Sequence, residues 1–141
     1  MNVIRLKPGA GFPVLAPAGA RIIAALDGIC QDLKTDLVIS SGSEAMGRLA
    51  TDPHPLGEAV DVSVRGQSAQ LIADLHAALT AKLGPLFTVL YEVPSIPSDP
   101  TLRPIAYVNA KATGVHFHIQ RKRGTVYPPD PVTAPPATMQ A

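Results

Sequence analysis

Strict alternation of apolar and polar residues in two short runs constrains the fold of this chain more than any other feature. In residues 59–64 three valines alternate with Ala, Asp and Ser, and in residues 115–120 Val, Phe and Ile alternate with His, His and Gln. Successive side chains of a strand point to opposite faces of its sheet. Each run therefore predicts a strand with one apolar face for a core and one polar face. If the two strands are neighbours in one sheet, Asp61 and His118 point into the same cleft.

The histidines and the aspartate of these runs indicate a metal site. His54 precedes the first run, in a loop that Pro53 and Pro55 stiffen and in which Gly57 lets the backbone turn. A single histidine near a strand is usually a surface residue or a core residue. Here three of the four histidines of the chain, together with an aspartate, fall at compatible positions. Imidazole and carboxylate groups form the ligand set that suits zinc in a site with one open position.

The two runs resemble the motifs of the LAS zinc peptidases. This family includes D-Ala-D-Ala carboxypeptidases, phage L-Ala-D-Glu endolysins, murein endopeptidases and the hedgehog signalling domain. The first motif, His-x-x-Gly-x-Ala-x-Asp, stands at residues 54–61, and the second, His-x-His, stands at residues 116–118. The resemblance covers roughly residues 36–121.

The resemblance implies a ligand set and an activity. It implies that His54, Asp61 and His118 bind zinc, and that His116 lines the site and stabilises the oxyanion. The activity that it implies is zinc-dependent hydrolysis of cell-wall peptides, with a peptidoglycan peptide as substrate.

The general base of this family has no counterpart at its usual place. The family has a Glu, Asp or His three to six residues before the last ligand, whereas this chain has Ala-Thr-Gly-Val at residues 112–115. None of these side chains can accept a proton. His116 and Glu92 are the two alternatives for the catalytic base. The position of Glu92 near the end of its strand favours a solvated carboxylate over one that faces the cleft.

Two further positions depart from the family pattern. The upstream Ser-Gly-Tyr-Arg, whose Arg contacts substrate, is replaced by Ser-Gly-Ser-Glu at residues 41–44, so this cation is missing. Arg48, in the following loop, is an alternative source of a cation. Asp52 stands where the family often has Ser, two residues before the first histidine.

The remaining pattern predicts an α+β fold. Apolar residues at helical spacing predict helices over residues 18–34 and 68–83, with Cys30 on the buried stripe of the first. Ser68 is suited to cap the second helix, and Gly84 is suited to end it. We expect a small, mostly antiparallel sheet with two helices packed on one face and a zinc cleft on the other. The other strands that we expect lie at residues 3–6, 37–40, 86–93 and 105–108.

Length and composition predict one folded domain followed by a tail. At 141 residues, the chain has the length of a single domain. We expect a zinc peptidase-like domain over residues 1–124 and an extended, Pro-rich C-terminal tail over residues 125–141. The tail is the segment that we expect to contact protein partners.

Charge and hydropathy exclude several classes of partner. The net charge is +1, aromatic residues make up 4% and Trp is absent, so nothing favours nucleic acid. No run approaches the roughly 20 apolar residues that a membrane helix needs. The first seven residues are too few and too polar for a signal peptide, so we expect synthesis in the cytoplasm. A single Cys excludes an internal disulfide.

Three functional hypotheses follow. The first is a zinc-dependent peptidase that resembles D-Ala-D-Ala carboxypeptidases and phage endolysins. The second is a catalytically weak or inactive structural protein with the peptidase fold, which would belong to the tail or head of a phage particle and would be held by its Pro-rich tail. The third is a metal-binding signalling or adaptor domain. The missing base favours the second hypothesis, and the intact ligand motifs favour the first.

Overall fold

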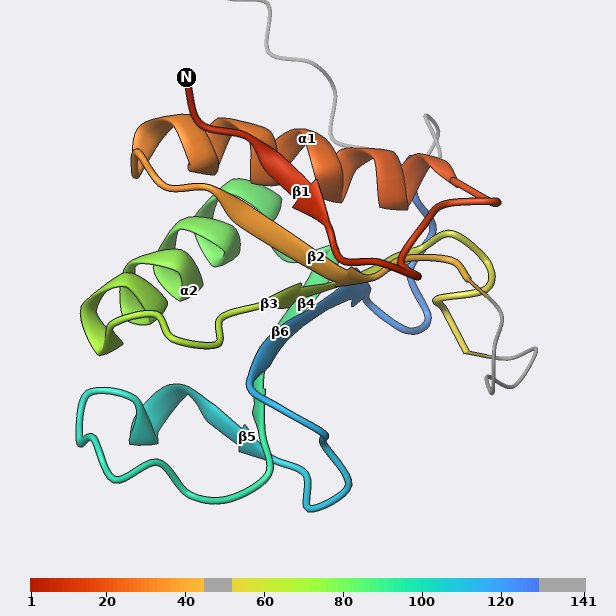
Figure 1. Ribbon diagram of the computed structural model, residues 1–141. Helices are drawn as coiled ribbons and strands as arrows, with labels where there is room; N and C mark the ends of the chain where they lie inside the picture. Colours follow the sequence, from red (N-terminus) through yellow and green to blue (C-terminus); the bar gives the residue numbers. More distant parts are fainter. Residues whose placement is uncertain (45–51, 130–141) are drawn as a thin grey trace, which may run out of the picture.

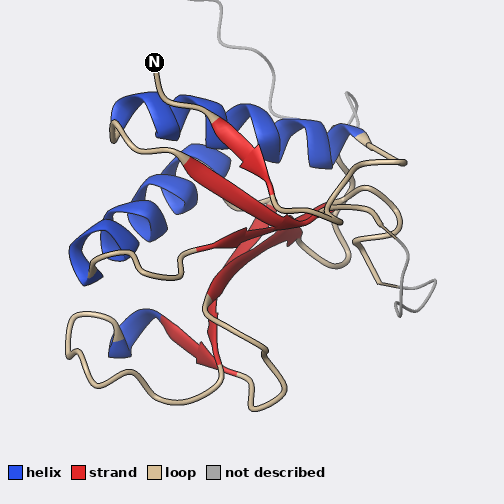
Figure 2. Cartoon of the chain, in the orientation of Figure 1, coloured by secondary structure: helices blue, strands red, loops and turns tan. Residues whose placement is uncertain are grey.

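The computed structural model describes residues 1–44 and 52–129, which form a six-stranded sheet with two helices packed on one face (Figure 1 and Figure 2). The helices are α1 (Pro17–Asp32) and α2 (Ala69–Leu83), and a short 3₁₀ helix, η1, covers Arg103–Ile105. The strands are β1 (Ile4–Leu6), β2 (Leu37–Ser41), β3 (Ala59–Ser63), β4 (Phe87–Val93), β5 (Ala106–Val108) and β6 (His116–Arg121).

The sheet is mixed, with the strand order β1-β2-β3-β6-β4-β5. The inner pairs β2–β3, β3–β6 and β6–β4 are antiparallel, whereas β1–β2 and β4–β5, at the two edges, are parallel. The α+β class is confirmed, but the expectation of a mostly antiparallel sheet is wrong. The reason is that α1 carries the chain from β1 back to the start of β2, and residues 94–105 do the same between β4 and β5. Such crossovers produce parallel neighbours, unlike hairpins.

Both helices lie where the apolar periodicity places them. Helix α1 ends at Asp32 rather than at residue 34, and Cys30 is fully buried on its inner face. Ser68 caps α2, because its Oγ accepts the Leu71 amide at 3.1 Å. Gly84 ends α2 with a φ of 72°, in the left-handed region that favours glycine. Neither helix is long and apolar enough to cross a membrane, as far as the described residues go.

The core fills the space between the two helices and one face of the sheet. The valines of β3 are buried there with Phe117 and Ile119 of β6, in one continuous apolar cluster with both helices. The alternate residues of β3 and β6 therefore lie on the opposite, polar face. Strands β3 and β6 are direct neighbours, and Asp61 is paired with His118. The alternation in the sequence thus assigned the two faces correctly.

Contacts of the folded unit continue beyond residue 124. The ring of Tyr127 lies 5.2 Å from the ring of Phe87, edge to face, and packs against the core. Residues 130–141 of the predicted tail lie outside the described residues.

Candidate metal centre

Three side chains that the motifs single out converge on one point of the polar face. Asp61 of β3 and His118 of β6 are cross-strand partners, and His54 approaches them from the loop before β3. Asp61 Oδ1 lies 2.9 Å from His118 Nδ1 and 3.2 Å from His54 Nε2. The two nitrogens lie 3.3 Å apart. These donor atoms form a group with the spacing of metal ligands.

The triangle of donor atoms has the size that a tetrahedral zinc site needs. Zinc binds histidine nitrogen and carboxylate oxygen at about 2.0–2.1 Å. Two such ligands at a tetrahedral angle are about 3.3 Å apart. The observed separations of 2.9, 3.2 and 3.3 Å lie at or just below this value. The side chains therefore fit the metal with only a small outward movement of Asp61.

The outer ring nitrogens of both histidines are already occupied by acceptor oxygens. His54 Nδ1 lies 2.9 Å from the carbonyl oxygen of Gly42, and His118 Nε2 lies 2.6 Å from Gln120 Oε1. A carbonyl oxygen can only accept, so these outer nitrogens carry the proton in the neutral rings. The inner nitrogens then present lone pairs to the same space as a carboxylate oxygen. Such an arrangement needs a cation or a proton between the three atoms, and carbonyl partners of this kind orient histidine ligands in metal sites.

The loop that carries His54 is fixed at both ends. Asp52 Oδ1 accepts the His54 amide at 2.8 Å, so the carboxylate serves as the local cap at this departure from the family pattern. Gly57 has a φ of 73°, and a Cβ there would lie 2.7 Å from the Val14 carbonyl oxygen. The Gly57 carbonyl oxygen in turn accepts the Ala16 amide at 3.2 Å. The turn therefore docks against the segment that leads into α1, and His54 is 1% exposed.

An irregularity in β2 shapes the opposite side of the centre. The pairing of β2 with β3 shifts by one residue at Ser40, which is a β-bulge of the kind that often lies beside functional sites. Gly42, just beyond the bulge, packs so closely that a Cβ would lie 2.3 Å from the Gly11 carbonyl oxygen. Glu44 holds this turn, because its carboxylate accepts the Gly42 amide at 2.6 Å. The Gly42 carbonyl oxygen is thereby fixed toward His54.

Asp61 and His118 shift each other's pKa in the metal-free chain. Burial acts to raise the pKa of Asp61, but hydrogen bonds from His118 and His54 outweigh burial and hold this pKa well below its usual range. Burial also acts to lower the pKa of His118, but the hydrogen bond to Asp61 raises it above its ordinary value. A proton on His118 thus takes the place that a metal ion would fill.

His116 and Glu92 form a second pair on the same face of the sheet. The two residues are cross-strand partners in β6 and β4, and Glu92 Oε1 lies 3.2 Å from His116 Nε2. The Glu92 side chain is 19% exposed, so it is partly buried against His116 and not fully solvated. His116 lies two residues from His118 along one strand, so the pair is about 7 Å from the candidate metal ligands. Both alternatives for the base therefore lie on the same face of the sheet, next to the Asp61–His118 pair.

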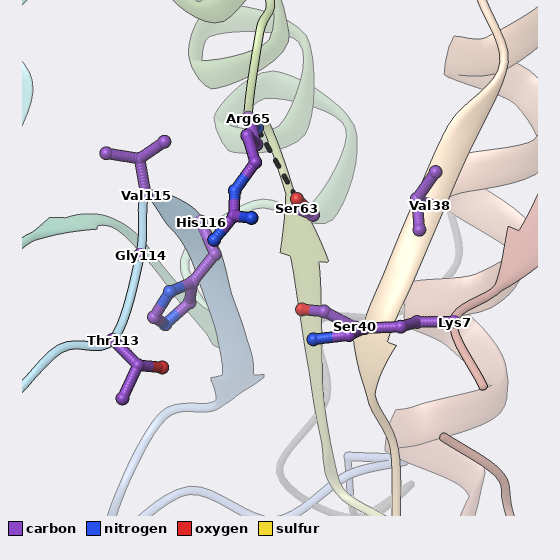
Figure 3. A pocket seen from close by; sticks show the side chains of 9 residues that line it. All are labelled: Lys7, Val38, Ser40, Ser63, Arg65, Thr113, Gly114, Val115 and His116. Carbon is purple, nitrogen blue, oxygen red and sulfur yellow. Dashed lines mark hydrogen bonds between the residues drawn. The ribbon is translucent and has the colours of Figure 1, made fainter. Parts of the chain in front are cut away.

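A pocket of about 260 Å³ opens beside His116 (Figure 3). Two cations, Lys7 and Arg65, line it, and the sequence motifs did not indicate either of them. Neither residue belongs to either motif, and exposed cations are too common for the sequence to single out these two. Arg48, the alternative cation, lies outside the described residues. None of the three side chains of the candidate metal centre lines this pocket, so it is not the zinc cleft that the sequence predicts.

No family model, curated protein or solved structure matches this chain. The functional argument therefore depends on the motifs and on the geometry of the described residues.

Proposed function

We propose that this chain is a zinc-dependent peptidase that acts on cell-wall peptides, with zinc bound by His54, Asp61 and His118. The observation that carries the proposal is the convergence of three donor atoms. Two of them belong to imidazole rings whose outer nitrogens already have hydrogen-bond acceptors. The substrate class depends on the resemblance of residues 54–61 and 116–118 to the motifs of the LAS peptidases.

The ligand set is that of a catalytic zinc site rather than a structural one. Structural sites are usually closed by four protein ligands, whereas catalytic sites use three and keep one position for water or substrate. A bound zinc ion supplies Lewis-acid activation of a carbonyl group and lowers the pKa of a coordinated water. The chain keeps the two imidazoles in the ligating tautomer through the Gly42 carbonyl oxygen and Gln120 Oε1.

We assign the proton-handling role to Glu92 and His116. Glu92 is a carboxylate on the ligand-bearing face, and it accepts the proton from the attacking water. His116 donates a hydrogen bond to the oxyanion that forms at the scissile carbonyl. General-base help is typically worth about 10²- to 10⁴-fold in rate. Glu92 thus takes the role of the base that the family has in the segment before its last ligand.

Release of peptides from purified peptidoglycan tests the activity. The wild-type chain is expected to release peptides, Asp61→Asn to release none, and Glu92→Gln to be slower by about 10²- to 10⁴-fold. Asp74→Asn is a matched control, because Asp74 is an exposed carboxylate on α2 whose hydrogen-bond partner is Gln70. A wild-type chain that binds zinc but releases nothing would reject the peptidase.

A structural protein with the same fold is the second candidate. The observation that favours it is the segment at residues 112–115, which offers no proton acceptor on the approach to β6. Such a protein, for example in a phage particle, would bind zinc without turnover. Removal of zinc would then lower its free energy of unfolding by several kcal/mol, because zinc binding would serve folding. Chemical denaturation with and without chelator, read beside the peptide-release assay, separates the two candidates.

A further inference from the structure

An ion pair joins the two motif-bearing segments at one end of the sheet. Arg121, the last residue of β6, donates from Nε to the carboxylate of Glu58, which directly precedes β3. Arg121 Nη2 also lies 3.4 Å from Glu58 Oε1, so the contact is the two-pronged fork that arginine forms with a carboxylate. The backbone repeats the link, because the Arg121 amide donates to the Glu58 carbonyl oxygen at 3.2 Å. Both side chains are mostly buried, so salt and water screen this pair less than a surface pair.

Glu58 also closes the turn that carries His54. The Glu58 amide donates to the carbonyl oxygen of Pro53 at 3.0 Å, and the Gly57 amide donates to the carbonyl oxygen of His54 at 2.9 Å. These two bonds make residues 53–58 one compact turn. The ion pair attaches the end of this turn to β6, the strand that carries the second motif.

The ion pair occupies matching positions on the two strands. Glu58 stands three residues before Asp61, and Arg121 stands three residues after His118. Because β3 and β6 are antiparallel, these offsets bring the two charged residues to the same end of the pair of strands. Arg121 shares its face of β6 with the buried Ile119, so the ion pair lies on the core side of the sheet. The proposed ligands lie on the other face, and the ion pair acts on them through the backbone.

The C-terminal segment at residues 122–129 is attached to the same guanidinium group. Arg121 Nη1 donates to the carbonyl oxygen of Thr125. The Thr125 amide and hydroxyl groups both donate to the carbonyl oxygen three residues earlier, at 3.1 and 2.5 Å, which makes a tight turn. Beyond this turn, the Tyr127 ring packs against Phe87, which is the cross-strand partner of Arg121. Figure 1 shows this segment in blue beside the yellow loop that precedes β3.

We propose that Arg121 is a positioning residue for the metal centre, and that the segment at residues 122–129 controls zinc affinity through it. One guanidinium group contacts the His54 turn and the C-terminal segment, and it belongs to β6. It thus holds the turn where His54 Nε2 lies 3.2 Å from Asp61 Oδ1. Displacement of the segment by a binding partner therefore weakens zinc binding. This proposal deepens the proposed peptidase and rests on it for the identity of the metal.

Zinc affinity of the full chain tests the role of Arg121. Arg121→Met removes the charge and the donors but keeps an unbranched side chain, and it is expected to weaken zinc binding by about tenfold, as loss of a partner beyond the ligands does. Competition with a chromophoric chelator measures this under conditions in which each protein is fully folded. A variant that only loses stability then keeps its zinc affinity. Arg5→Met is the matched control, because Arg5 pairs with Asp36 at the opposite end of β2 from the metal centre.

Two further variants identify the ion pair and the segment as the cause. Glu58→Gln alone is expected to weaken zinc binding, but in the Arg121→Met background it should have little further effect, because the pair is already broken. Tyr127→Ala removes the ring that packs on Phe87 and leaves both charges in place. We expect this variant to weaken zinc binding as well, by less than Arg121→Met.

Three results would overturn the positioning role: wild-type zinc affinity in folded Arg121→Met, additive losses in the double variant, or an equal loss in Arg5→Met. Wild-type zinc affinity in Tyr127→Ala would overturn the control by the C-terminal segment. Peptide release from peptidoglycan is scored separately. Zinc affinity that depends on Arg121 without peptide release would keep the positioning role and remove only the proposed hydrolysis. Peptide release with unchanged zinc affinity in every variant would do the reverse.

Discussion

Replacement of Gln120 by leucine tests whether His118 is held as a metal ligand. Gln120 Oε1 accepts the proton of His118 Nε2 at 2.6 Å, and this bond leaves Nδ1 as the lone-pair donor that faces Asp61 and His54. In Gln120→Leu the ring loses this acceptor, so it can rotate or adopt the tautomer that cannot bind zinc through Nδ1. Loss of such a partner typically weakens metal binding by about 10- to 100-fold. This range corresponds to about 1.4 to 2.7 kcal/mol.

Competition with a chromophoric chelator at fixed pH measures the effect on zinc affinity. Gln70→Leu is the control, because Gln70 is exposed on α2, where its side-chain amide donates a hydrogen bond to Asp74. Gln70→Leu should leave zinc affinity unchanged. Unchanged zinc affinity in folded Gln120→Leu would refute the reasoning, because it would mean that the outer nitrogen of His118 does not set the ligand geometry.

Three more predictions follow from contacts around the centre. Gly42→Ala should lower the free energy of unfolding by about 1–3 kcal/mol and weaken zinc binding, because its Cβ would lie 2.3 Å from the Gly11 carbonyl oxygen. Chemical denaturation measures this loss, and a variant as stable as the wild type would contradict the prediction. The raised pKa of His118 gives stability below about pH 6.5 that is lost as the pH rises through the folded-state pKa. The free energy of unfolding of the zinc-free chain should therefore fall as the pH is raised above about 6.5, and a slope unchanged in Asp61→Asn would count against the pair. Ser68→Ala should cost about 1 kcal/mol through loss of the α2 cap while zinc affinity stays constant; altered zinc affinity would show that the helix end and the metal centre are coupled.

The sequence predicted the faces of the central strands because burial imposes a period of two. The alternation in residues 59–64 and 115–120 placed Asp61 and His118 on the polar face, and the register of β3 with β6 makes them partners. The boundaries of α2 followed from its apolar stripe and from the cap and stop residues Ser68 and Gly84. In each case the signal is local, since it depends on residues within one element.

Features that depend on pairing between distant segments could not be predicted. The parallel edge strands β1 and β5 are three residues each and carry no periodic signal. Glu92 was expected to be solvated, but its partner His116 is supplied by β6, which lies beside β4 only through the sheet order. The cationic pocket is equally non-local, because it combines residues that follow β1 and β3 with the start of β6.

Zinc content of the purified full chain tests the central claim most directly. The protein is prepared without chelator, and bound zinc per chain is determined for wild type and for Asp61→Asn, a variant that keeps the size of the side chain but removes its charge. We expect close to one zinc per wild-type chain and a large loss in the variant, because Asp61 is one of the three proposed ligands at the centre. Wild-type protein without bound metal, or a folded variant that keeps its zinc, would contradict the metal centre described above.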